Sequence, residues 1–326
     1  MMTNRVAQIL KIEKPIIQGP LLWLTDAKLV AAVSNAGGLG VIGFNAGQTT
    51  VTRSLDETIE RTRNEIRKTR QLTDKPFGLN LAMSNNPNDT FFEPTLQLMI
   101  DEQVPVAICV GDFNADQVTK VKAAGITVVF RPITPTVEIT KQAEAAGVDI
   151  FVATGFDEGG TIPTKVIGTL SAVPMVVDAA NDMPVMAAGG IVDARTAKAV
   201  FALGAEGLYA GTAFMMSEES RLAENIKALA LKADADDLVM YRTLPAYYRS
   251  LPGELPDKLV QMDNKGASRE EISKASSAGD GMRIGMLEGD LTKGYASFGL
   301  GISQIKKIEP VSVIMDRLNE GVPEEN

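Results

Sequence analysis

Two glycine-containing segments of the sequence have the composition of an anion-binding turn. The first is AAGGI, residues 187–191, and a helix is expected directly after it, from Asp193 to Leu203. The second is AGT, residues 210–212. Glycine lets backbone N–H groups approach an anion closely, and the start of a helix carries a partial positive charge. Each segment alone also fits a plain tight turn. Together they predict a phosphate site made of Ala188, Gly189, Gly190, Ala210, Gly211 and Thr212.

Two other segments could place main-chain or amide groups against a flat ligand. Gly19 and Pro20 follow a short apolar stretch, and Leu21 comes directly behind them. Asn80 is a polar amide near the end of the apolar segment 76–82. A buried asparagine must be hydrogen-bonded, so Asn80 is expected either to contact a ligand or to fix a loop.

A third candidate is the segment TGFDEGGTIP, residues 154–163. It carries two carboxylates, Asp157 and Glu158, directly before a glycine pair and Thr161. Carboxylates can act as general acids or bases. A solvated loop is nevertheless the simpler interpretation of both acids, and we adopt it here.

The composition excludes several classes of chemistry. The chain has 326 residues, 32 Lys and Arg against 41 Asp and Glu, and no histidine. Without imidazole there is no Ser-His-Asp triad, no Cys-His pair and no HExxH zinc site. Proton transfer must therefore use a carboxylate, lysine, tyrosine, Cys109, water or a cofactor. The net charge of −9 argues against a nucleic-acid partner.

Eight short apolar segments alternate with helical patterns, and they predict the scaffold that must position these residues. Apolar runs without alternation fit strands buried on both faces of a parallel sheet. Eight such units predict a closed (β/α)₈ TIM barrel, with a doubly wound sheet as the alternative. In a barrel, functional groups gather at the carboxyl ends of the strands. The segments are residues 15–20, 39–44, 76–82, 104–111, 126–133, 148–155, 183–191 and 206–214.

The remaining sequence suggests three parts. Residues 1–217 form the predicted barrel, and its first long helix is expected from Thr25, as N-cap, to Asn35. Residues 218–293 are charged and helix-rich without a strong strand signal, so they predict a helical domain near the barrel's C-terminal face. Residues 294–326 are expected to return to the barrel and end in a capping helix.

Compartment and partners follow from a few further features. Cys109 lies in an apolar run and is expected to be a small core residue. A single cysteine cannot form an internal disulfide, the N-terminus has no apolar signal region, and no stretch is long enough for a membrane span. We therefore expect a cytoplasmic protein with a small-molecule substrate and neither nucleic acid nor membrane as partner. A homodimer is compatible with these features.

The motifs, taken in order, resemble the nitronate monooxygenase family, formerly called 2-nitropropane dioxygenases. The flavin-dependent enoyl-acyl-carrier-protein reductases belong to the same superfamily. The resemblance covers nearly the whole chain and rests mainly on AAVSNAGGLGVIG at residues 31–43 and on AAGGI. It extends through the EGG loop, LGAEGLYAGTAF at residues 203–214 and GDLTKGYASFGLG at residues 289–301.

The resemblance implies a barrel that binds FMN, with a helical second domain beside the active site. Gly189, Gly190, Gly211 and Thr212 would hold the FMN phosphate. The remaining implied positions contact or surround the isoalloxazine ring. They are Gly19, Pro20, Leu21, Asn80, Gly159 and Gly160 around the ring, and Ala296 and Ser297 closing the site.

Thr161 is the main departure from the family pattern. The family's Gly-Gly-His motif carries an active-site histidine directly after the glycine pair, and here that position is Thr161. A threonine hydroxyl can donate or accept a hydrogen bond but cannot act as a base near neutral pH. Leu21 stands where the family usually has methionine, and Pro163 where it usually has glycine.

These observations predict an FMN-dependent oxidoreductase that oxidises a small anionic substrate, such as an alkyl nitronate, with O2. An alkyl nitronate is already an anion, so its oxidation does not strictly require a base. In this interpretation Thr161 occupies the catalytic position and only positions the substrate. One alternative is an NAD(P)H-dependent reductase of an enoyl thioester or a quinone. Others are a flavin-binding barrel without the parent activity and a phosphate-binding barrel without flavin.

Overall fold

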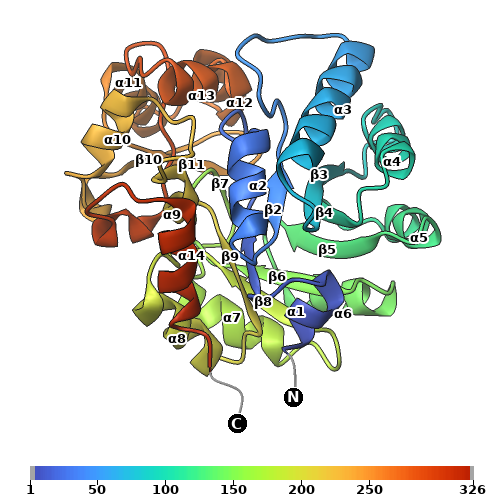
Figure 1. The fold of residues 1–326 in the computed structure, drawn as a ribbon. Coiled ribbons are helices and arrows are strands. Elements are labelled where there is room, and N and C mark those ends of the chain that lie inside the picture. Colours follow the sequence, from blue (N-terminus) through green and yellow to red (C-terminus); the bar gives the residue numbers. More distant parts are fainter. Residues whose placement is uncertain (1–3, 324–326) are drawn as a thin grey trace.

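The computed structural model describes residues 4–323 and shows a parallel β-barrel surrounded by helices (Figure 1). The sheet order is β1-β9-β8-β6-β5-β4-β3-β2. A parallel bridge between Ile17 and Leu39 joins the two ends of the sheet. The predicted TIM barrel is confirmed, and one strand begins in every predicted apolar segment. The strands are β1 (Ile16–Gln18), β2 (Gly40–Ile42), β3 (Phe77–Met83), β4 (Val106–Gly111), β5 (Thr127–Pro132), β6 (Ile150–Thr154), β8 (Val185–Ala188) and β9 (Gly207–Ala210).

The strands are apolar throughout because both of their faces are buried. One set of side chains points into the barrel, among them Ile17, Val41, Ile108, Val152 and Met186, and all of these are fully buried. The alternate residues pack outward against the helices in a larger apolar cluster. A strand with two buried faces cannot alternate apolar and polar residues, which explains the continuous apolar runs in the sequence.

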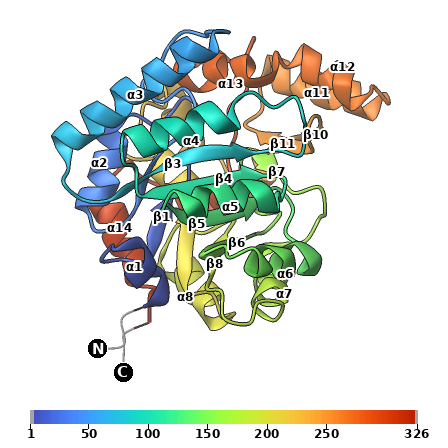
Figure 2. The same ribbon diagram turned by 90° about the vertical axis from the view of Figure 1, so that its right-hand side faces the viewer.

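Helices follow the strands and form the outer layer (Figure 2). The first long helix begins one residue later than predicted, because Asp26, not Thr25, is its N-cap and accepts a hydrogen bond from the Leu29 amide. The Thr25 hydroxyl instead accepts from the Gly43 amide and so fixes the end of β2. The layer comprises α2 (Ala27–Asn35), α3 (Leu55–Leu72), α4 (Phe92–Asp101), α5 (Ala115–Ala123), α6 (Val137–Ala145), α7 (Thr169–Val177), α8 (Ala194–Ala202) and α14 (Val311–Asn319).

The two ends of the barrel differ. Helix α1 (Arg5–Leu10) closes the amino end, where Val6 and Leu10 join the apolar cluster inside the barrel. The segment between β9 and α14, residues 211–310, lies over the opposite end and is called the second segment below (Figures 1 and 2). Its helical elements are α9 (Thr212–Met215), α10 (Glu224–Ala230), the 3₁₀ turn η1 (Ala235–Asp237), α11 (Glu254–Asn264), α12 (Arg269–Ala275), α13 (Ala278–Leu287) and the 3₁₀ turn η2 (Leu300–Gln304).

Residues 218–293 contain two strands, although their sequence shows no strong strand signal. Strands β10 (Val239–Arg242) and β11 (Tyr247–Ser250) form an antiparallel hairpin. Strand β11 also pairs with β7 (Thr161–Ile162), which belongs to the loop after β6. This small sheet therefore joins the second segment to a barrel loop. How the chain divides into domains at residues 217 and 293 stays a prediction.

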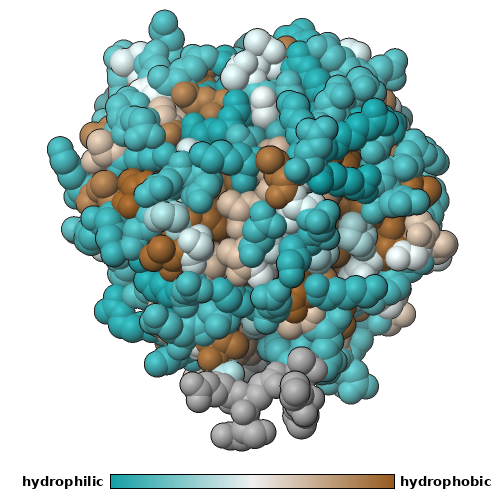
Figure 3. All heavy atoms as spheres, viewed as in Figure 1, coloured by the Kyte–Doolittle hydropathy of each residue, from teal (hydrophilic) through white to brown (hydrophobic). Residues whose placement is uncertain are grey.

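The surface fits the acidic, mixed composition of the chain. Hydrophilic residues cover most of the face in Figure 3, and hydrophobic residues occur there in small separate patches. Among the helices described, none is long and apolar enough to cross a membrane.

Candidate functional site

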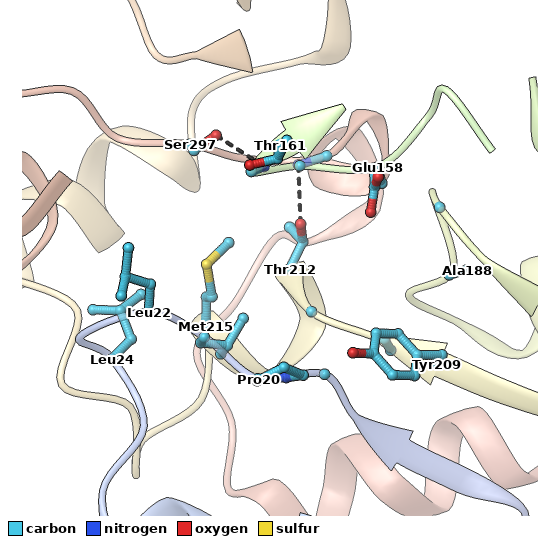
Figure 4. A pocket seen from close by; sticks show the side chains of 18 of the residues that line it. Pro20, Leu22, Leu24, Glu158, Thr161, Ala188, Tyr209, Thr212, Met215 and Ser297 are labelled. Atoms are coloured by element: carbon cyan, nitrogen blue, oxygen red, sulfur yellow. Dashed lines mark hydrogen bonds between the residues drawn. The ribbon is translucent and has the colours of Figure 1, made fainter. Parts of the chain in front are cut away.

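A pocket opens at the carboxyl ends of the barrel strands, beneath the second segment (Figure 4). Its volume is about 260 Å³. Thr161 and every residue predicted to bind the cofactor line it: Gly19, Pro20, Leu21, Asn80, Gly159, Gly160, Ala188, Gly189, Gly190, Ala210, Gly211 and Thr212. Of the two closing residues, Ser297 lines the pocket and Ala296 is buried behind it. The structure thus brings these residues together, and their roles in binding stay a prediction.

The turns after β8 and β9 present backbone amides to one end of the pocket. Gly189 and Gly190 have φ angles of +106° and +73°, which side chains rarely allow. The amides of Gly189, Gly190 and Gly211 find no hydrogen-bond acceptor among residues 4–323. Buried or partly buried backbone donors are normally paired, so this cradle suits an anion. The side chain of Asp193 caps helix α8 just behind the turn.

The turn after β1 lies beside the turn after β9, close to Tyr209. A Cβ atom added to Gly19 would lie 2.6 Å from the Tyr209 ring, so only glycine lets this turn approach β9 so closely. Asn80 donates its side-chain amide to the Ile108 carbonyl at 3.0 Å while lining the pocket. Asn80 is therefore fixed to the neighbouring strand, and its orientation toward the pocket is set by the barrel.

The solvated-loop interpretation is wrong for Glu158. Only 8% of this residue is exposed, and it lines the pocket. Its carboxylate forms an ion pair with Arg131 at the end of β5. Burial raises the pKa of Glu158 to about 7, although the Arg131 charge acts in the opposite direction. Asp157, its neighbour, accepts a hydrogen bond from the Thr169 amide at the start of α7 and has a structural role.

Arg249 of β11 holds the main chain of the same loop. Its guanidinium donates to the carbonyl oxygens of Glu158 and Phe156, at 2.5 and 3.1 Å. It also lies over the Phe156 ring, 5.4 Å from the centroid. Burial lowers the pKa of Arg249. The loop that carries Glu158 and the glycine pair is thus fixed by a residue of the second segment.

Thr161, at the position of the family histidine, is hydrogen-bonded to a tyrosine. Its hydroxyl lies 2.9 Å from the Tyr248 hydroxyl, and both residues line the pocket. The two residues face each other in the β7–β11 register, and the Tyr248 ring packs edge-on against Tyr295. Burial raises the pKa of Tyr248, so the phenol is neutral at physiological pH. Both groups are therefore hydrogen-bonding hydroxyls and neither is a base near neutral pH.

Ser297 ties the glycine pair to the C-terminal segment. Its hydroxyl accepts from the Gly160 amide at 2.9 Å and donates to the Arg249 carbonyl at 2.6 Å. The Gly299 amide donates to the Thr212 hydroxyl at 3.0 Å. Figure 4 shows both contacts crossing the upper part of the pocket. Ser297 and Gly299 thus contact the glycine pair and Thr212 across the pocket.

Sequence reasoning missed several pocket residues, among them Tyr248 and the two groups described next. Arg131 and Tyr209 lie in predicted strands, and a charged residue at the end of an apolar run was the available signal for Arg131. The second group is an apolar wall. It consists of Leu22, Leu24, Met215, Met282 and Met286. Met282 and Met286 are four residues apart on α13, so they share one face of that helix.

The pocket fits a flat heteroaromatic cofactor that carries a phosphate. The glycine turns supply free amides for an anion, and Gly19, Gly159 and Gly160 line the pocket with main chain and no side chains. A Cβ atom at Gly159 would lie 2.5 Å from the Gly299 amide nitrogen. Arg131 and Asn80 add polar groups between these surfaces.

Comparisons with known proteins agree with this interpretation. The family model "Nitronate monooxygenase" matches residues 3–321. A nitronate monooxygenase of Pseudomonas aeruginosa is 36% identical over 261 residues, which are 67% of this chain and 71% of the relative. A hydroxy-methyl-oxo-octahydroindene-carboxyl-CoA dehydrogenase of Rhodococcus jostii is 31% identical over 269 residues, 81% of this chain and 70% of the relative.

A solved structure extends the similarity to the whole fold. FabK from Thermotoga maritima superposes with a TM-score of 0.84 and 31% identity, covering 98% of this chain and 95% of FabK. The family match and the structural similarity both span the barrel and the segment above it. The chain belongs to the nitronate monooxygenase family and is a flavin-dependent oxidoreductase.

Proposed function

We propose that this protein binds FMN and oxidises small anionic substrates of the alkyl nitronate type with O2. The observation that carries the proposal is the Thr161–Tyr248 hydroxyl pair at the position of the family histidine. Two neutral hydroxyls can hold a charged oxygen but cannot remove a proton from carbon near neutral pH. A nitronate needs no such step, because it already carries the negative charge.

The cofactor position is inferred from the shape and polarity of the pocket. The amides of Gly189, Gly190 and Gly211 would hold the phosphate. The turn of Gly19 and Pro20 would lie against one face of the ring, and Gly159 and Gly160 would line it, as the family resemblance implies. A flavin bound there would accept two electrons from the substrate and pass them to O2.

The polypeptide supplies binding and orientation. Tyr248, whose hydroxyl accepts from Thr161, would donate its own O–H to a nitronate oxygen, and the apolar wall around Met215 and Met282 would take the alkyl part. The second segment lies over the pocket, because β11 and the Ser297 contact hold it there.

Spectroscopy of the purified protein tests this proposal. We expect a flavin absorption spectrum and release of FMN, identified by mass, on denaturation. Anaerobic addition of ethyl nitronate should bleach the spectrum, and air should restore it. A colourless protein that takes up no FMN, or a flavoprotein that ethyl nitronate does not reduce, would overturn the proposal.

A second candidate is an NAD(P)H-dependent reductase acting on an acyl thioester. The named reaction partner of the Rhodococcus jostii relative, a carboxyl-CoA, supports a thioester substrate. The apolar wall, with three methionines, also fits an acyl chain. Rapid anaerobic bleaching by NADH or NADPH, followed by reoxidation with an enoyl thioester, would favour this candidate over nitronate oxidation.

We also propose a cytoplasmic location. Its support is the single, fully buried cysteine, Cys109, which forms no disulfide in the structure and suits a reducing compartment. Fractionation of cells that express the full-length protein, with detection by antibody, tests this point.

A further inference from the structure

We propose that Glu158 is a general base that removes the α-proton of a neutral nitroalkane, while Arg131 holds the nitro group. The protein would then generate its own nitronate in the pocket where the nitronate is oxidised. This inference rests on the proposed function for its substrate class. It assigns a catalytic role to the carboxylate directly before the glycine pair and not to position 161.

The two carboxylate oxygens of Glu158 have different surroundings, and one of them is available to accept a proton. One carboxylate oxygen, Oε2, contacts the Arg131 guanidinium. The other, Oε1, is buried and has no hydrogen-bond partner among residues 4–323. Figure 4 shows the side chain directed from the loop above into the space that Thr212 and Tyr209 also face. An unsatisfied buried carboxylate oxygen is costly, and a bound proton donor would remove that cost.

Arg131 has free donors on the same wall. Its Nη2 donates to Glu158, and the guanidinium makes no other hydrogen bond within the described chain. It lies over the Tyr209 ring, 6.0 Å from the centroid, and lines the pocket. A planar guanidinium with unused N–H groups suits the two coplanar oxygens of a nitro group. The pair therefore offers an acceptor and a set of donors side by side.

These two groups match what deprotonation of a nitroalkane requires. The α-carbon–hydrogen bond breaks, and the proton forms an O–H bond with Oε1 of Glu158. The electron pair of the broken bond enters the C=N bond of the nitronate, and the negative charge moves to the two former nitro oxygens. The unused Arg131 donors would stabilise that charge as it develops. No oxidant is consumed, because the step only moves a proton.

The surroundings set the basicity of Glu158. The charged and titratable groups that face it are Arg131 from β5, Tyr209 from β9, Arg249 from β11 and its chain neighbour Asp157. Burial raises its pKa to about 7 against the two arginine charges. A base is most effective when its pKa lies near the working pH. Glu158 is the only carboxylate among the residues that line the pocket in the described chain.

Hydrogen exchange at the α-carbon tests the step separately from oxidation. Nitroethane is incubated in D2O with the anaerobic holoenzyme, and loss of the α-proton signal is followed by NMR. Wild type should accelerate exchange over the protein-free solution, and Glu158→Gln should lower that rate on the order of 100-fold. The ratio of nitroethane to ethyl nitronate turnover in air should fall by a similar factor.

The matched control is Glu102→Gln. Glu102 is also a buried carboxylate paired with arginines, but it lies between α3 and α4, away from the pocket. The rate of nitroethane α-proton exchange with this variant should equal the rate with wild type. If Glu158→Gln fails to fold, the pH profile of wild-type exchange decides. A rise with a midpoint near 7 supports the proposal, and a flat profile contradicts it.

The possible results separate this inference from the proposed function. Equal exchange in Glu158→Gln and wild type overturns the role of Glu158. Exchange without reduction of the flavin by ethyl nitronate keeps Glu158 as a carbon-acid base and overturns nitronate oxidation. Reduction of the flavin by ethyl nitronate without catalysed exchange supports nitronate oxidation and overturns the role of Glu158 as a base.

Discussion

Arg249 donates a hydrogen bond to the main-chain oxygen of Glu158, 91 positions earlier in the sequence, at 2.5 Å. The same side chain also binds the carbonyl of Phe156. The loop with the pocket carboxylate is therefore held by a strand from the second segment. The shape of the site depends on the folding of both parts of the chain.

The first prediction concerns this contact. Arg249→Met should lower the free energy of unfolding by about 2–3 kcal/mol, because one buried and one partly buried carbonyl group lose their partner. It should also lower the flavin content, since the Gly159–Gly160 pair is no longer held in place. Urea unfolding and flavin absorbance per protein measure the two effects. Arg269→Met is the control, because Arg269 only stacks on Tyr247 in the same segment. Equal losses in both variants would contradict the prediction.

The second prediction concerns the anion cradle. Gly190→Glu should abolish FMN retention, because its carboxylate would occupy the proposed phosphate position. Gly190 has a φ of +73°, so any side chain placed there also strains the backbone, and this strain needs its own control. Gly125→Glu supplies it, since Gly125 has a φ of +74° and open space where a Cβ would lie. A folded Gly190→Glu protein with normal flavin content would refute the phosphate assignment.

The third prediction restores the residue type that the family has at position 161. Thr161→His should keep FMN bound, because Thr161 lies on β7 and does not belong to the glycine turns. It should alter the reaction profile and introduce a pH dependence near the ordinary histidine pKa of about 6.5. Steady-state turnover of nitronate, nitroalkane and NADH across pH 5–9 measures this. Unaltered turnover and pH dependence would mean that position 161 does not contact the substrate.

The fourth prediction follows from the buried carboxylate. The pKa of Glu158 is raised from 4.5 to about 7 in the folded protein. The folded state thus binds this proton more tightly than the unfolded chain does. The resulting stability is complete below pH 4.5 and is lost as the pH rises through 7, a change of about 3 kcal/mol. Urea unfolding at several pH values should show this loss in wild type and not in Glu158→Gln.

The contribution of Glu102 to the free energy of unfolding depends on pH with the opposite sign. Glu102→Gln therefore serves as the control for pH effects. Arg67 and Arg63 lower the pKa of Glu102 against the effect of its burial. Its contribution is therefore present above the unfolded pKa and is lost as the pH falls. If Glu158→Gln keeps the full wild-type slope between pH 5 and 7, Glu158 does not titrate in that range.

The sequence was informative where local composition decides the structure. The barrel strands were predictable because burial on both faces requires continuous apolar runs, as in Val106–Gly111. The glycine turns were predictable because a positive φ or a close approach leaves little choice of residue. Both properties can be read from a few consecutive letters.

The polar part of the site was not predictable in this way. Glu158 looks solvated because it stands among glycines, and its partners Arg131 and Arg249 lie 27 and 91 positions away. Strands β10 and β11 were missed because each has only four residues and carries arginine and tyrosine. Tyr248 enters the pocket only through its pairing with Thr161. Such contacts depend on the tertiary fold and leave no local signal.

Helix α14 has a consequence for the order in which the protein can be made. It packs against α2, α8 and β1, and buries Val311, Ile314, Met315 and Leu318 there. Lys14, near the start of the chain, reaches Asp316 of this helix at 2.6 Å. The elements β1, α2 and α8 can therefore pack against α14 only after the ribosome has synthesised the chain through residue 319. Until α14 has been made, the faces of α2, α8 and β1 that it covers lack this partner, so this seam of the barrel can close only then.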